Sequence, residues 1–99
     1  FRFTAPSNPA RHLRAAQLMG ANVAEVGLDE AGEILADRII ELMKATGMPN
    51  GLAAVGYQSD DLDDLVAGTL PQQRLTKLSP IPADAGTLRR LFDESLTLW

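Results

Sequence analysis

Two cations, Arg74 and Lys77, stand in a stretch of chain that has no acidic residue between Asp64 and Asp84. Neither has the i,i+4 acidic partner that often neutralises a charge on a helix. Arginine offers a planar fork of donors and lysine a compact point charge, and both suit a carboxylate or a phosphate. The two residues are therefore candidate ligands for an anionic group on a substrate or on a neighbouring domain. The alternative interpretation is two solvated surface charges.

An acidic cluster precedes this stretch and could in principle bind calcium; it consists of Asp60, Asp61, Asp63 and Asp64. A calcium loop of the EF-hand type needs oxygen ligands at alternate positions and a glycine at the sixth. Counted from Asp61, the fifth and sixth positions are Leu65 and Val66. The cluster is better interpreted as charges in the first turn of a helix, where the helix dipole favours anions.

The chain has a single histidine, His12, and no cysteine. The lack of cysteine excludes disulfides, thiolate zinc sites, iron–sulfur clusters and cysteine nucleophiles. One imidazole cannot build a multi-histidine metal site, so we interpret His12 as a surface or packing residue. Ser59 has no nearby histidine and no Gly-x-Ser-x-Gly turn, and is interpreted as a helix cap. An acyl carrier is disfavoured, because the nearest match to its attachment serine, Ser95, falls inside a predicted helix.

Composition narrows the class of protein further. The 99 residues carry a formal net charge of −4, and 45% of them are hydrophobic. This fits one domain with a modest core, and the acidic balance argues against a nucleic-acid partner. No uncharged stretch approaches the ~20 apolar residues that cross a bilayer. Without a recognisable leader peptide or an initiator methionine before Phe1, we expect a piece of a larger, cytoplasmic protein.

Capping residues and apolar spacing predict the elements that carry these side chains. Asn8 and Pro9 can start a helix that Gly20 ends, and Asp29 and Asp84 are candidate caps for later helices. The predicted helices cover residues 9–19, 30–46, 59–70 and 84–98. Shorter turns are predicted over residues 50–55, closed by Gly56, and over residues 72–75, followed by an extended crossing through residues 79–82. No strand pattern competes, so the class is all-α, a bundle of four to five helices in one domain over residues 1–99.

Three strings carry a family resemblance: RHLRAAQLMGANV, then GLAAVGYQSDDLDDLVAGTLPQQRLTKLSPIP over residues 51–82, and finally LRRLFDESLTLW. Together they resemble the C-terminal end of the iron-containing alcohol dehydrogenases. Within that family the chain is most similar to the hydroxyacid-oxoacid transhydrogenase branch, and GTLPQQRLTKL is the string typical of that branch. The resemblance covers essentially all 99 residues and implies part of a dehydroquinate synthase-like helical domain.

For a longer parent protein, the resemblance implies an N-terminal α/β domain that binds NAD(P) and a helical domain that supplies one aspartate and three histidines to a divalent metal, usually iron. The metal polarises an alcohol while hydride passes to nicotinamide. In the transhydrogenase branch, a hydroxyacid such as 4-hydroxybutyrate reduces the cofactor, which then reduces an oxoacid such as 2-oxoglutarate. The last histidine ligand lies upstream of Phe1 and His12 matches no ligand position, so no catalytic, cofactor-binding or metal-binding residue is carried over.

We therefore expect a C-terminal fragment that is inactive alone and binds neither metal nor cofactor itself. Its expected partners are the nucleotide-binding domain of the parent chain and further copies in a homo-oligomer, with no nucleic acid and no membrane. The segment with Arg74 and Lys77 aligns with a family stretch near the substrate cleft, so both are candidate substrate ligands, although the family's Asn-Pro-Arg reads here as Ser79, Pro80 and Ile81. The alternative is a free-standing helical interaction module without catalysis.

Overall fold

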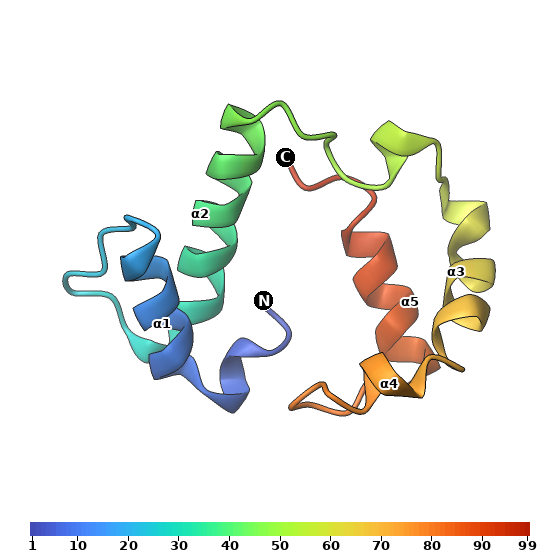
Figure 1. Cartoon of the computed structure of the whole chain (residues 1–99), viewed down its shortest axis with the longest axis horizontal. Coiled ribbons are helices and arrows are strands. Elements are labelled where there is room, and N and C mark those ends of the chain that lie inside the picture. The colour runs from blue at the N-terminus through green and yellow to red at the C-terminus, as the bar shows by residue number, and fades with distance from the viewer. The chain divides into compact units, whose positions relative to one another are not determined.

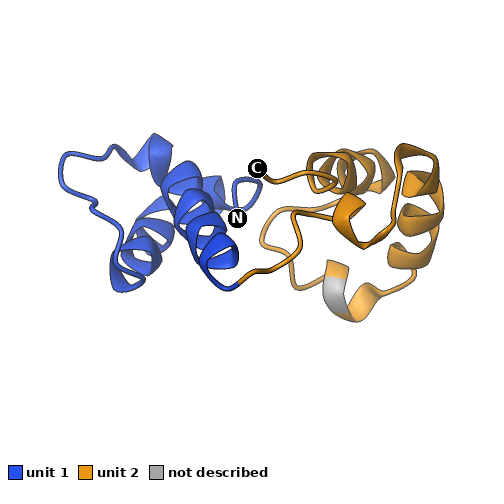
Figure 2. Cartoon of the chain, turned by 90° about the horizontal axis from the view of Figure 1, so that it is seen from above, with its two compact units in different colours: residues 1–46 blue, residues 47–99 orange. Residues whose placement is uncertain are grey.

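All regular elements in the described part of the chain are helical, as Figure 1 shows for this computed structural model. The structure describes residues 1–74 and 76–99. The all-α class predicted from the sequence is confirmed. Contacts divide the chain into two compact units, residues 1–46 and residues 47–99, coloured separately in Figure 2. The single domain over residues 1–99 stays a prediction.

Unit 1, residues 1–46, is built on a pair of packed helices. Its elements are η1 (Ala5–Ser7), α1 (Pro9–Leu18), η2 (Leu28–Glu30) and α2 (Ala31–Ala45). The start of α1 follows the prediction, because the Asn8 Oδ1 accepts a hydrogen bond from the backbone N–H of Arg11 at 3.1 Å. The end of α1 also follows the prediction. Gly20 lies just beyond it with a φ of 91°, which a residue with a Cβ rarely adopts.

Small side chains form most of the core of unit 1. Ala16 and Ala31 are fully buried, and Leu35 is the bulkiest buried residue among them. Gly32 is buried in the first turn of α2, where an added Cβ would lie 3.0 Å from the Cβ of Ala5. The small residues thus let the N-terminal segment and α1 approach the backbone of α2 closely, in the manner of close-packed interiors.

Two arginines link separate segments of unit 1 through ion pairs and a hydrogen bond. Arg2 forms ion pairs with Glu33 and Asp37, which are one turn apart on α2. Arg38 donates from Nε to the carbonyl oxygen of Met19 at 2.6 Å, at the end of α1. Arg2 therefore joins the segment before η1 to α2, and Arg38 joins the end of α1 to α2.

Unit 2, residues 47–99, contains the remaining elements. They are η3 (Ala53–Val55), η4 (Ser59–Asp61), α3 (Leu62–Thr69), α4 (Gln73–Thr76) and α5 (Ala85–Glu94). The α3 and α5 helices pack against each other. Among the described residues of this unit, the buried apolar ones are Leu62, Val66 and Leu88. A surface ion pair between Asp63 and Arg89, 3.0 Å apart, adds a second link between the two helices.

A bridge between a loop and the C-terminal tail completes unit 2. The backbone N–H groups of Leu52 and Ala53 donate to the carbonyl oxygens of Ser95 and Leu96, at 2.9 and 3.0 Å. Gly51 makes this approach possible, because its φ is 73° and an added Cβ would lie only 2.5 Å from both carbonyl oxygens. We call residues 50–53 and 95–99 the loop–tail bridge.

The side chain of Asn50 adds the outer part of this bridge. Its Oδ1 accepts hydrogen bonds from the backbone N–H groups of Leu98 at 2.8 Å and Trp99 at 3.0 Å. Its Nδ2 donates to the carbonyl oxygen of Trp99. One amide side chain thus satisfies three backbone groups that would otherwise need water.

The loop–tail bridge explains why the last helix is shorter than predicted. The apolar spacing predicted a helix to residue 98, but α5 ends at Glu94. Beyond that residue, backbone groups of the chain bond to residues 50–53 instead of continuing the helical ladder. Tertiary hydrogen bonds have therefore overridden the local periodicity.

Two predicted caps are wrong, although the helices they were to begin are present. Asp29 does not start the second helix; the carboxylate of Glu30 accepts from the backbone N–H of Gly27 at 3.0 Å instead. Ser59 is the first residue of η4, and the carboxylate of Asp61 accepts from the backbone N–H of Gln58 at 2.7 Å. In both places the carboxylate of the third residue of the turn accepts from the backbone N–H of the residue before the turn. This bond is one of the two that make up a capping box.

Candidate functional site

Arg74 and Lys77 lie on one exposed helical turn of unit 2. Arg74 is in α4, and the backbone N–H of Lys77 donates to the carbonyl oxygen of Gln73 at 3.0 Å, so the turn reaches Lys77. A spacing of three residues on such a turn puts both side chains on the same side. Both are exposed, and neither forms an ion pair within the part of the chain that the structure describes. The structure thus places the two predicted ligands on one turn; their binding role stays a prediction.

The surroundings of these cations limit what they can do alone. Leu70 is 41% exposed and Leu78 is 80% exposed, so apolar surface flanks the pair on both sides in the sequence. A carboxylate bound only by exposed cations gains about 0–1 kcal/mol, because water screens the charges. A contact worth the ~1.5–3 kcal/mol of a charge-assisted hydrogen bond needs water to be excluded. The pair can recognise an anion strongly only where another surface covers it.

His12 is engaged by its own segment. Its Nδ1 lies 2.9 Å from the carbonyl oxygen of Asn8 and its Nε2 lies 3.3 Å from the Oγ1 of Thr4. The ring also meets that of Phe1 edge to face, with the ring centroids 6.4 Å apart. These contacts agree with the packing role predicted for this histidine.

The described residues do not assemble the metal-ligand set that the family resemblance implies for the parent protein. Within residues 1–74 and 76–99, no three histidine, aspartate or glutamate side chains come together as metal ligands. Both ring nitrogens of His12 already face atoms of the chain. No chemical step through a metal or cofactor can be derived from these residues.

The acidic cluster has the structural role expected from the sequence. Asp60 and Asp61 lie in η4, and Asp63 and Asp64 in the first turn of α3. Asp61 accepts a backbone hydrogen bond and Asp63 pairs with Arg89. These carboxylates therefore begin a helix and link it to its neighbour.

Asp84 begins the last helix of unit 2. Its Oδ1 accepts a hydrogen bond from the backbone N–H of Thr87 at 2.8 Å, which makes it the N-cap of α5 as predicted. This backbone bond, and next the Thr87 hydroxyl, hold the pKa of Asp84 below its ordinary value. The lowered pKa is therefore a consequence of helix capping.

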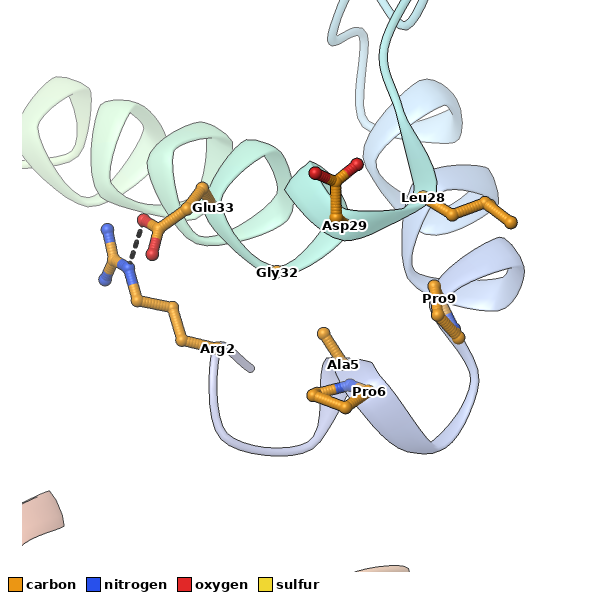
Figure 3. A pocket seen from close by; sticks show the side chains of 8 residues that line it. All are labelled: Arg2, Ala5, Pro6, Pro9, Leu28, Asp29, Gly32 and Glu33. Carbon is orange, nitrogen blue, oxygen red and sulfur yellow. Dashed lines mark hydrogen bonds and ion pairs between the residues drawn. The ribbon is translucent and has the colours of Figure 1, made fainter.

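A cavity of about 450 Å³ lies in unit 1. Figure 3 shows the ion pair of Arg2 and Glu33 at one end and Leu28 with Pro9 at the other. The complete lining is Arg2, Ala5, Pro6, Pro9, Leu28, Asp29, Gly32 and Glu33. We call it the unit 1 pocket. It was not predicted, since its walls come from segments up to 31 residues apart that only the fold brings together.

The comparisons with known proteins agree with the resemblance seen in the sequence. All 99 residues align with a probable mitochondrial hydroxyacid-oxoacid transhydrogenase of Dictyostelium discoideum at 50% identity, over 18% of that protein. Mitochondrial hydroxyacid-oxoacid transhydrogenases of Xenopus tropicalis and Homo sapiens align over the whole chain at 46% and 42% identity, over 21% of each. The predicted similarity to this branch is confirmed.

The chain spans about a fifth of the length of the curated relatives it matches. No protein-family profile matches it. No solved structure matches it either. Within the described residues, no helix has both the length and the apolar character needed to cross a membrane.

Proposed function

We propose that these residues form the C-terminal helical part of an oxidoreductase that transfers hydride between a hydroxyacid and an oxoacid. The observation that carries the proposal is the alignment of all 99 residues with hydroxyacid-oxoacid transhydrogenases at 42–50% identity. Identity at this level over all 99 residues supports a shared fold and a shared place in the larger protein. In this proposal the chain supplies structure and part of the substrate surface, and it is inactive alone.

A chimeric protein tests the proposal directly. The matched 99 residues of the Dictyostelium discoideum relative are replaced by this chain, and transfer of hydride from 4-hydroxybutyrate to 2-oxoglutarate is measured. We expect activity within about tenfold of the unaltered relative, and none from the 99-residue chain under the same conditions. A folded but inactive chimera would contradict the proposal and favour a free-standing interaction module.

The proposal assigns the metal and the cofactor to the rest of the longer protein. Iron or another divalent metal, and NAD(P), are bound outside these residues; among the described ones, no group of three possible metal ligands forms. The partner of this chain is then the nucleotide-binding domain of the same polypeptide, and the whole forms a homo-oligomer. Metal analysis and sedimentation of the active chimera, before and after chelation, test these assignments.

Arg74 and Lys77 are proposed to bind the substrate carboxylate in the assembled enzyme. Their shared exposed turn and their lack of ion pairs among the described residues support this role. Both hydroxyacids and oxoacids carry a carboxylate, so a cationic surface suits either substrate.

Substitution of either cation in the active chimera separates recognition from structure. Arg74→Gln and Lys77→Gln are each expected to lower kcat/KM for 4-hydroxybutyrate by roughly ten- to a hundredfold, the equivalent of ~1.5–3 kcal/mol. The rate with butanol, which has no carboxylate, is expected to change less than about twofold. Equal losses on both substrates would show that the turn only supports the fold.

The compartment stays a prediction. The sequence predicted a cytoplasmic location, whereas the relatives have mitochondrial in their names. Imaging of the full-length protein in its own cells decides between the two.

A further inference from the structure

The unit 1 pocket combines an apolar wall with an acidic rim. Ala5, Pro6 and Pro9 provide apolar surface, and Leu28 is 58% exposed at the same end as Pro9. The exposed Leu28 side chain thus adds to the apolar surface of this wall.

The charges at the rim specify the chemistry of that segment. Arg2 is already committed to Glu33 and Asp37. Asp29 lines the pocket but takes part in no side-chain hydrogen bond or ion pair within the described residues. The rim therefore carries excess negative charge that a lysine or arginine would neutralise.

The length of the relatives indicates where the segment comes from. They are about five times longer than this chain, so most of their polypeptide lies outside the region that matches. We infer that the unit 1 pocket binds a segment of the longer polypeptide that places an apolar side chain against Pro9 and Leu28 and a lysine or arginine beside Asp29. This inference rests on the proposed function, because the occupant belongs to the same larger protein.

Cysteine labelling tests the occupant, since the chain has no cysteine of its own. Leu28→Cys is introduced into the 99-residue chain and into the chimera described above, and the rate of maleimide labelling at that site is measured by peptide mass spectrometry. We expect labelling at least about tenfold slower in the chimera. Ala24→Cys, an exposed position outside the pocket, is the matched control and is expected to react equally in both proteins.

The charge is tested separately. Asp29→Asn is expected to lower the Tm of the chimera by several degrees and to leave that of the 99-residue chain unchanged. Glu25→Gln, an exposed acid outside the pocket, is expected to change neither. An effect of Asp29→Asn on both proteins alike would mean a role within unit 1 and would overturn the charge assignment.

The remaining outcomes also decide the matter. Equal labelling rates of Leu28→Cys in both proteins overturn the inference. Labelling of the 99-residue chain that slows as its concentration rises also overturns it, because a second copy would then be the occupant. If the chimera does not fold, overlapping peptides from the rest of the relative are titrated against the chain with a dye at Leu28→Cys. Binding of a basic peptide that Asp29→Asn weakens supports the inference, and no binding overturns it. A protected Leu28→Cys in an inactive chimera would contradict only the proposed function.

Discussion

The two units both have a small helical core, but different interactions hold their segments together. In unit 1, α1 and α2 are joined by buried alanines and by arginine side chains that reach from one segment to another. In unit 2, α3 and α5 share a few larger apolar residues, and the loop–tail bridge supplies backbone hydrogen bonds. Unit 1 therefore depends on close approach of helices, and unit 2 depends on one loop conformation.

This difference implies different sensitivities to mutation. A packed helix pair loses stability gradually when side chains change, because neighbouring residues adjust in part. A bridge made through a glycine with positive φ fails abruptly, because the backbone itself must move. Four predictions test this contrast, in order of decreasing effect.

The largest effect is expected at Gly51. Gly51→Ala places a Cβ 2.5 Å from the carbonyl oxygens of Ser95 and Leu96 at a φ of 73°, and should lower the free energy of unfolding of unit 2 by ~3 kcal/mol. Urea denaturation followed by fluorescence of Trp99, the sole tryptophan, measures it. Gly47→Ala is the control, because it has a similar φ of 70° and nothing within 4 Å of the added Cβ. Its expected cost is ~1 kcal/mol; equal costs at both positions would contradict the bridge.

Asn50→Ala should have the next largest effect. It removes three hydrogen bonds to the tail, at an expected cost of ~2 kcal/mol after compensation by water. Faster amide exchange at Leu98 and Trp99, with little change in α3, would locate the loss in the loop–tail bridge. Asn22→Ala, which removes one local bond to the N–H of Ala24, serves as the comparison. Unchanged exchange in the tail would exclude the role assigned to Asn50.

Glycine substitutions within helices should give opposite signs in the two units. Gly32→Ala in α2 brings a Cβ to 3.0 Å from that of Ala5, and we expect a loss of ~1 kcal/mol despite better helix propensity. Gly68→Ala in α3 meets nothing within 4 Å and should stabilise by ~0.5–1 kcal/mol. Amide exchange in α2 and α3 reports both values. A gain in stability from Gly32→Ala would contradict close packing between Gly32 and Ala5.

The smallest effect concerns the caps of α1 and α5. Asp84 has a pKa below its ordinary value in the folded chain, so its contribution to stability is present above its unfolded pKa of about 4. That contribution is lost as the pH falls through the lower, folded value. The difference in Tm between the wild type and Asp84→Asn should therefore shrink between pH 6 and pH 2. Asn8→Ala, which alters the uncharged cap of α1, should give a difference independent of pH.

The helices could be predicted because their signals are local. Asn8, Gly20 and Asp84 mark helix ends through their own side chain or backbone freedom, and the structure has them in those roles. The two wrong caps, at Asp29 and Ser59, were also local errors: an acid three residues into each turn accepts from the N–H group at its start, so each turn begins before the predicted cap. Arg74 and Lys77 could be singled out because the lack of acids around them is visible in the sequence.

The sequence by itself determined the helical class, most helix positions, the relationship to the transhydrogenases and the pair of candidate cations. Only the tertiary structure decided that α5 ends at Glu94, that Asn50 and Gly51 hold the tail, and that Arg2 and Leu28 border one pocket. Helix periodicity and capping act over three or four residues and are therefore readable along the chain. Hydrogen bonds and cavities between segments 30 to 50 residues apart depend on the path of the backbone in space, which no local pattern encodes.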